Sequence, residues 1–211
     1  MSIKLEAIFI FCRQLLLVES NGYESSKAEL RALEWSDAST QWIERGRTPA
    51  AIGRNGMTSA KLEGDLKTPI GLYQMGTGFG TLPKPIGSDW PFCSVGQNDF
   101  WVDDPASPDY NQWVIYAGDP RERWASFERL AIPPYAYAAV IRYNDNPIVP
   151  GKGSAIFLHI WSGPDSSSAG CVTVSEEEMV RILQWLDPGR HPHMAIGTSR
   201  ELSVLVPFYR T

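Results

Sequence analysis

Long apolar runs, paired cysteines and clustered positive charge are all scarce in this chain of 211 residues. No stretch reaches the ~18 consecutive apolar residues that mark a membrane-spanning helix, so a stable membrane span is not expected. The 19 lysines and arginines are scattered and the net charge is −5, which argues against a nucleic-acid partner. A sizeable apolar content of 43% is instead typical of a globular protein, and we expect a single domain over residues 1–211.

Cysteine is limited to Cys12, Cys93 and Cys171, and an odd number leaves at least one thiol free. The close Cys spacing of a structural zinc site is missing, while a Cys12–Cys93 disulfide stays open. Near the N-terminus Lys4 precedes an apolar run, but Arg13 interrupts it and no small-residue cleavage site follows. We therefore predict a β-hairpin or a long strand there, and no signal peptide.

Hydrophobic patterning predicts a mainly β fold. Strands are expected at 13–19, from 71 onward, and at 136–142, 156–161, 172–174, 193–197 and 202–208; residues 26–35 fit either a helix or a strand, and the glycine-rich 76–80 segment is assigned to a loop. Asn55-Gly56 is a hairpin signal. One α-helix is predicted after residue 175, because Ser175 and Glu178 form a capping box and Pro188-Gly189 ends the apolar stripe that follows.

The segment 156–174, IFLHIWSGPDSSSAGCVTV, organises the chain as strand, loop and strand. If the strands lie side by side, the imidazole of His159 can lower the pKa of the Cys171 thiol and accept its proton at an accessible groove. Gly170 would let a carbonyl approach closely, with the backbone N–H groups of Gly170 and Cys171 stabilising an oxyanion. This combination predicts acyl transfer through a thioester.

The same residues resemble the YkuD-type L,D-transpeptidases of bacterial cell walls. The resemblance extends through RQLLLV (13–18), KLEGDLKTPIGLY (61–73), WVDDPASPDYN (101–111) and NPIVPGKGSAIFLHIW (146–161), and its most specific part is the Ser-x-Gly-Cys element that ends at Cys171. It implies a mainly β, sandwich-like catalytic fold. It also implies action on peptidoglycan stem peptides in the periplasm or cell envelope, without metal or organic cofactor, and inhibition by carbapenems.

The resemblance assigns roles residue by residue. Cys171 would attack the carbonyl of the third stem residue and release terminal D-alanine, His159 would be the base, and Ser168 would orient the imidazole. Gly170 and Cys171 would supply the oxyanion donors. We further expect substrate-binding side chains at Trp101, Tyr110, Tyr143, Asn144 and Trp161.

Two departures from the family pattern leave the reaction open. Many members have His between the Ser and the Gly, and Arg two residues after the Cys, where this chain has Ala169 and Thr173. That Arg is associated with substrate anchoring, so hydrolysis by an L,D-carboxypeptidase or endopeptidase is an alternative to transfer.

Two other classes of function compete. His159, His191 and His193 could assemble a zinc site, although the latter two flank a proline in a turn-like segment. A non-catalytic peptidoglycan-binding module could instead hold glycan strands with aromatic side chains, namely Trp90, Trp101, Trp113 and Trp161.

Overall fold

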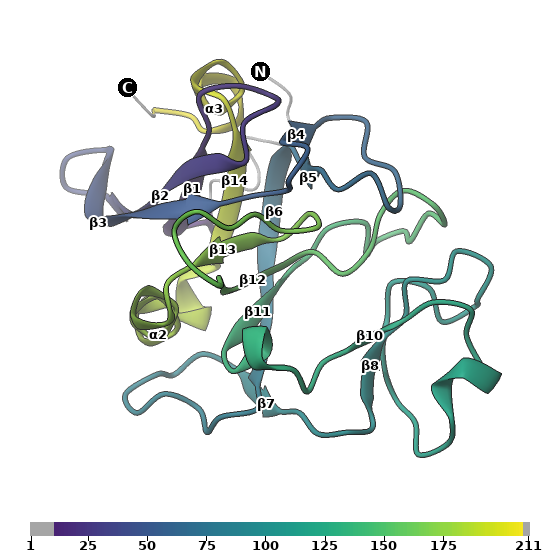
Figure 1. Cartoon of the computed structure of the whole chain (residues 1–211). Helices are drawn as coiled ribbons and strands as arrows, with labels where there is room; N and C mark the ends of the chain where they lie inside the picture. The colour runs from purple at the N-terminus through teal and green to yellow at the C-terminus, as the bar shows by residue number, and fades with distance from the viewer. Residues whose placement is uncertain (1–10, 209–211) are drawn as a thin grey trace.

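The computed structural model describes residues 11–208, which form one extensive sheet, two smaller sheets and two α-helices (Figure 1). The strands are β1 (Gln14–Glu19), β2 (Lys27–Ser36), β3 (Gln41–Ala51), β4 (Met57–Thr58), β5 (Thr68–Pro69), β6 (Gly71–Gly80), β7 (Phe92–Ser94), β8 (Asp99–Trp101), β9 (Trp113–Ile115), β10 (Glu128–Arg129), β11 (Ala138–Ile141), β12 (Phe157–Ile160), β13 (Val172–Val174) and β14 (His193–Gly197). The helices are α2 (Glu176–Trp185) and α3 (Ser199–Leu205), with short 3₁₀ turns η1 (Pro120–Glu122), η2 (Pro133–Tyr135) and η3 (Pro188–Arg190). The prediction of a mainly β fold is confirmed.

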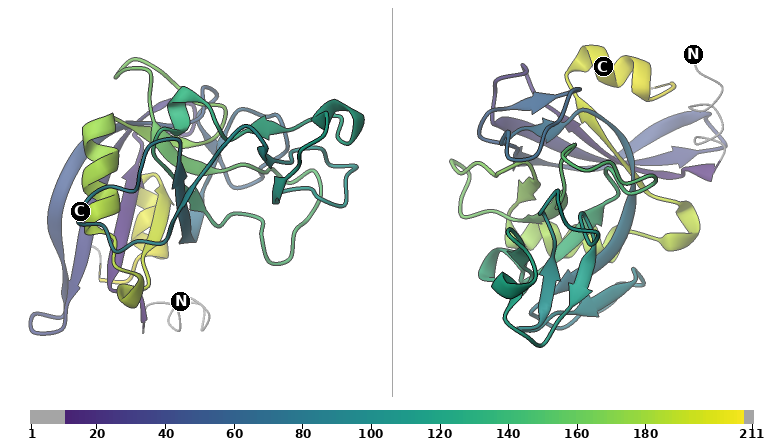
Figure 2. Two further views of the ribbon diagram at one scale, coloured as in Figure 1. Left: turned by 90° about the horizontal axis from the view of Figure 1, so that it is seen from below. Right: turned by 90° about the vertical axis from the view of Figure 1, so that its right-hand side faces the viewer.

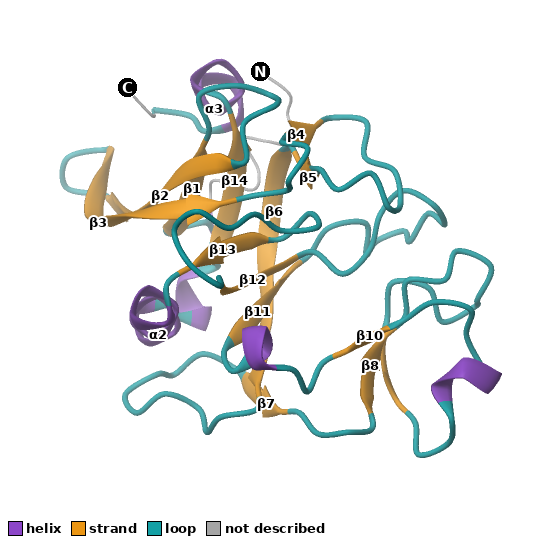
Figure 3. Cartoon of the chain, in the orientation of Figure 1, coloured by secondary structure: helices purple, strands orange, loops and turns teal. Residues whose placement is uncertain are grey.

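Eight strands of the main sheet close into a ring. Their order is β11-β12-β13-β3-β2-β1-β14-β6, and pairing between β6 and β11 completes the circle, while β7 extends the sheet beyond β6. Strands β1 and β14, β12 and β13, and β6 and β7 run parallel; the other neighbours are antiparallel. Figure 3 shows most strands of the main sheet at the left and centre of the molecule, while long loops surround β8 and β10 at the right.

Helix α2 covers one face of β12 and β13. It begins after Ser175, whose side chain accepts a hydrogen bond from the Glu178 N–H. This is half of the predicted capping box, because the Glu178 carboxylate pairs with Arg181 instead of the Ser175 N–H. Its apolar stripe packs into the large core cluster with Leu158 and Val172, the inward residues of the two strands. Cys171 belongs to a different cluster, together with Phe157, so its side chain lies on the face of the two strands away from α2.

The segment from β8 to β10 forms a separate three-stranded sheet beside the ring, with strand order β10-β8-β9. Both views in Figure 2 show this teal segment projecting from the rest of the fold. A small aromatic cluster of Phe100, Trp124 and Phe127 stabilises it. Residues 81–119, for which the sequence analysis predicts no strand, are therefore partly a sheet.

Two segments have a secondary structure other than the predicted one. Residues 199–205 form helix α3, not a strand at 202–208, because Thr198 and Glu201 make a reciprocal capping box and Leu202 and Val206 then share the buried side. The 76–80 segment is the end of strand β6, not a loop. Its glycines are needed because a Cβ at position 80 would lie 2.1 Å from the carbonyl oxygen of Ala136.

The Asn55-Gly56 turn forms, with the Gly56 N–H donating to the Gly53 carbonyl at 2.8 Å, but it does not join a hairpin. Strand β3 pairs with β2 and β13, whereas β4 pairs with β5. Residues 27–36 resolve as strand rather than helix. The N-terminal prediction falls mostly on residues 1–10, outside the described part of the chain, while β1 confirms the strand expected at 13–19.

Candidate active site

Parallel pairing of β12 with β13 brings His159 and Cys171 to one face of the sheet. His159 is opposite Thr173 and Leu158 is opposite Val172, so Cys171 follows as the neighbour of Phe157. Because side chains alternate along a strand, Phe157, His159, Cys171 and Thr173 share this face. The expected strand, loop and strand are therefore present in the arrangement that the sequence predicts.

The Cys171 thiol is held inside the protein, with 6% of the residue exposed. Its Sγ donates to the Ala155 carbonyl at 3.3 Å and accepts from the Phe157 N–H at 3.4 Å. Burial, and then the charge of Glu128, raise the pKa of the thiol far above its ordinary value. The thiol is thus protonated at rest, which corrects the expectation that His159 lowers its pKa at an open groove.

His159 has the tautomer of a base. Its Nδ1 lies 2.8 Å from the Ile160 carbonyl oxygen, which only accepts, so Nδ1 carries the proton and Nε2 keeps its lone pair. Burial lowers the pKa of the imidazole to about 4, so the ring is neutral at pH 7. Within residues 11–208 no hydrogen bond joins His159 to Cys171, so the expected direct contact is not formed; each side chain bonds to a nearby carbonyl instead.

Ser168 and Gly170 shape the turn before the nucleophile candidate. The Ser168 hydroxyl donates to the Cys171 carbonyl at 2.6 Å and accepts from the Gly170 N–H at 3.0 Å. Ser168 therefore braces the backbone instead of orienting the imidazole, and the Gly170 N–H is already bonded instead of free for an oxyanion. Gly170 has φ +148°, a conformation that favours glycine.

Tyr135 and Glu128 complete the surroundings of the pair. The Tyr135 ring packs edge-on against His159, with 5.0 Å between centroids, and its hydroxyl donates to Glu128 at 2.5 Å. Burial raises the pKa of Glu128 to about 7, helped by the nearby carboxylates of Asp103 and Glu63. The charge of Glu128 opposes ionisation of the Cys171 thiol.

Asn111 connects the predicted substrate residues to the site through the backbone. Its Oδ1 accepts from the indole N–H of Trp101 at 2.9 Å and from the Ala155 N–H at 3.2 Å, and its Nδ2 donates to the carbonyls of Tyr143 and Asn144. The Ala155 carbonyl in turn accepts a hydrogen bond from the Cys171 thiol. The 101–111 motif thus positions the backbone at Ala155, just before β12, which contacts the Cys171 thiol.

Tyr110 and Asn144 are structural in this arrangement, contrary to the sequence prediction. Tyr110 is 2% exposed, and its hydroxyl donates to Glu63 and accepts from the Gly153 N–H. The Asn144 side chain closes its own turn by donating to the carbonyls of Val149 and Gly153. Neither side chain is available to a substrate as it stands.

Trp101 and Tyr143, by contrast, line a cavity of about 470 Å³ beside the site. Trp90 and Trp113 line it as well, while Cys171 and His159 do not. Trp161, the remaining aromatic prediction, follows β12 and is half-buried, with its N–H bonded to the Val174 carbonyl. Three of the four tryptophans considered for glycan binding therefore meet at one cavity.

A comparison with protein families shows the family to which the chain belongs. The profile described as the L,D-transpeptidase catalytic domain YkuD matches residues 26–196, which is most of the chain. The chain belongs to the YkuD family. None of the curated proteins compared with it matches. Membership in the YkuD family supports catalysis related to peptidoglycan.

Neither a membrane helix nor a metal cluster is found in the described part of this YkuD chain. Among residues 11–208 no helix is long and apolar enough to cross a membrane. Within the same range no group of three His, Cys, Asp or Glu side chains could hold a metal ion. The three-histidine site is not assembled, since His193 Nδ1 faces the His191 carbonyl at 2.8 Å while His159 lies on another strand.

Sequence reasoning missed three residues that matter to this YkuD site: Lys61, Asn111 and Glu128. Lys61 and Asn111 belong to motifs on which the family resemblance depends, and nothing else in the sequence indicates a role for them. Glu128 had none, because β10 reaches Cys171 and Tyr135 only through tertiary packing.

Proposed function

We propose that this protein is a cysteine-dependent L,D-transpeptidase that acts on peptidoglycan stem peptides through a thioester on Cys171. The observation that carries the proposal is the common face of β12 and β13, where a thiol and a neutral imidazole with a free Nε2 come from adjacent parallel strands. Hydrogen bonds between catalytic groups are often long in the resting enzyme and tighten when substrate binds.

In the first step the thiol proton moves to His159 Nε2, and the sulfur attacks the carbonyl carbon between the third stem residue and terminal D-alanine. The C–N bond breaks, the nitrogen takes the proton from the imidazolium, and D-alanine leaves. A thioester then joins Cys171 to the stem. Because the Gly170 N–H is engaged by Ser168, we assign the Cys171 N–H as a donor to the developing oxyanion.

In the second step an amine of a neighbouring stem attacks the thioester carbonyl and passes its proton to His159. The C–S bond breaks and the thiolate recovers that proton, so the thiol is restored and a new amide remains. Water in place of the amine gives hydrolysis, the carboxypeptidase or endopeptidase alternative. The substrate implies that the protein works in the periplasm or cell envelope.

The test is incubation of the purified protein with tetrapeptide muropeptides, followed by mass spectrometry of the products. Transfer predicts a cross-linked dimer that lacks one D-alanine, and hydrolysis predicts a tripeptide. Intact muropeptides after prolonged incubation, with bound material recovered unchanged, would favour the non-catalytic binding module, whose aromatic contacts would then be those of the cavity lined by Trp90, Trp101 and Trp113.

A further inference from the structure

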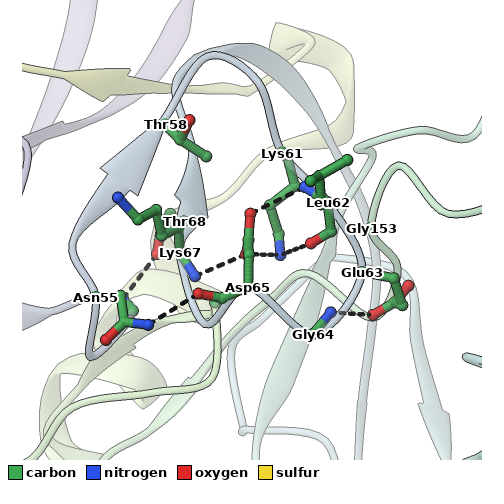
Figure 4. Close-up of polar contacts among 12 residues, drawn as sticks. Asn55, Thr58, Lys61, Leu62, Glu63, Gly64, Asp65, Lys67, Thr68 and Gly153 are labelled. Atoms are coloured by element: carbon green, nitrogen blue, oxygen red, sulfur yellow. Dashed lines mark hydrogen bonds and ion pairs between the residues drawn. The ribbon is translucent and has the colours of Figure 1, made fainter.

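A buried ammonium group lies in the turn between β4 and β5. Lys61 is 5% exposed, and its Nζ donates to Asp65 Oδ1 at 2.5 Å and to the Leu62 carbonyl at 2.9 Å (Figure 4). Asp65 also accepts from the backbone N–H groups of Leu62 and Lys67, both at 2.9 Å. Burial of a charge is costly unless it is paired and hydrogen-bonded, so this turn is built to hold a cation inside the protein.

Two glycines lie against the Lys61 side chain, and one of them, Gly153, makes room for it. A Cβ at Gly153, where φ is +98°, would lie 2.7 Å from Lys61 Cγ. A Cβ at Gly170 would lie 3.8 Å from Lys61 Cε. Lys61 therefore lies between the loop that precedes β12 and the turn that precedes Cys171, and its side chain accounts for the glycine at position 153.

The position of Lys61 next to Gly170 puts its charge close to the thiol. Titratable groups from four elements face Cys171. The charges of Glu128 of β10 and Lys61 of the turn act on the thiol, Tyr135 of η2 is coupled to it, and His159 of β12 shares its face of the sheet. Glu128 opposes formation of a thiolate and Lys61 favours it. Thr173, two residues after the cysteine, supplies no charge of its own and bonds to the Ala51 carbonyl.

We propose that Lys61 is a positioning residue for the reaction, whose buried ammonium, held by Asp65 beside Gly170, stabilises the thiolate of Cys171 when its proton leaves. This inference rests on the proposed role of Cys171 as nucleophile. The residue two positions after Cys171 is the uncharged Thr173. Lys61 supplies a positive charge near the thiol from a turn that is distant in the sequence. Asp65 sets the strength of that charge, because its carboxylate partly neutralises the ammonium.

The experiment measures alkylation of Cys171 by iodoacetamide as a function of pH, with peptide mass spectrometry to separate the three thiols. Lys61→Met keeps the aliphatic stem and removes the charge, and we expect the pH midpoint to rise by about one unit, or about tenfold slower reaction below the midpoint. Asp65→Asn leaves the ammonium unneutralised, so the midpoint should fall. Exposed Cys93 reports in every sample on the reagent itself.

Lys67→Met is the matched control, because Lys67 belongs to the same segment but pairs with Glu24 at 3.3 Å on the surface. Its midpoint should equal that of the parent. A merely structural Lys61 predicts no shift of midpoint, or shifts of the same sign in Lys61→Met and Asp65→Asn, and either result would overturn the proposal. If Lys61→Met does not fold, Asp65→Asn alone tests the proposal. An unchanged or higher pH midpoint of Cys171 alkylation in Asp65→Asn would then refute the role of Lys61.

This readout is independent of turnover. Muropeptides left intact while the midpoints shift as expected would refute the transpeptidase proposal and leave the electrostatic role of Lys61 standing. Turnover of muropeptides with unshifted midpoints would support the transpeptidase proposal and refute the electrostatic role of Lys61.

Discussion

Two buried thiols with a histidine close by lie in this fold, and only one has the surroundings of a nucleophile. Cys12 leads into β1, which runs parallel to β14 and aligns Leu15 with His193. Cys171 leads into β13, which runs parallel to β12 and aligns Thr173 with His159. Burial raises the pKa of both thiols, that of Cys12 to about 12.

The difference lies in what surrounds each sulfur. Cys12 follows Phe11 and donates to the Gln14 carbonyl at 3.2 Å, with no positive-φ glycine beside it. Cys171 follows Gly170, which has a positive φ and lies next to the Lys61 side chain, and an oriented imidazole shares its face of the sheet. A cysteine and a histidine on parallel strands are therefore insufficient; the preceding turn and a buried cation distinguish the two places.

Removal of each thiol tests this comparison with the largest expected effect. Cys171→Ala should reduce turnover of muropeptides by at least about 1,000-fold, because no acyl-enzyme can form. Cys12→Ala is the matched control and should keep parental activity. Circular dichroism checks that both variants fold, and comparable activity in a folded Cys171→Ala protein would remove the thiol from the mechanism.

The two histidines extend the same comparison. His159→Gln should lower turnover by about 100- to 10,000-fold, since the proton acceptor is lost. His193→Gln should leave turnover unchanged, because that ring faces the His191 carbonyl at the other parallel pair. A larger loss for His193→Gln than for His159→Gln, in steady-state assays of both, would mean that the wrong histidine was assigned.

Covalent labelling by a carbapenem sharpens the contrast between the thiols without any need for substrate. Intact mass spectrometry should show one inhibitor molecule per chain in the parent and in Cys12→Ala, and none in Cys171→Ala. The family relationship leads to this expectation. Labelling that persists in Cys171→Ala would point to another nucleophile.

The smallest expected effect concerns stability. Glu128 has its pKa raised to about 7, so the folded protein holds a proton that the unfolded chain releases, and stability falls as pH rises from about 4.5 to 7. His159 has its pKa lowered to about 4, so stability falls as pH drops from about 6.5 to 4.

Glu128→Gln should therefore gain stability over the parent at pH 8, by about 2 kcal/mol, and change little at pH 5. His159→Gln should compare more favourably with the parent at pH 5 than at pH 8. Urea unfolding at both pH values measures the free energies. Parallel pH profiles for the parent and Glu128→Gln would show that this carboxyl ionises as freely as on the surface.

Local patterns in the sequence were sufficient for several elements. The N-cap at Ser175 and the apolar stripe after it define α2 because both act within a few residues. Periodicity failed where a distant neighbour decides: the glycines of β6 make room for Phe92 and Ala136, and the apolar residues near the C-terminus turn helical once Thr198 and Glu201 cap them. The capping signal at 198–201 was present in the sequence and overlooked.

The sequence by itself determined the mainly β fold, the family and the two strands that carry His159 and Cys171, because β-branched runs, turn residues and short motifs are local properties. Only the tertiary structure decided the state of the thiol. Glu128 and Lys61 reach Cys171 from two separate elements, each more than forty residues away from it along the chain. Electrostatic effects depend on distance in space and on burial, and neither can be read from positions along a chain.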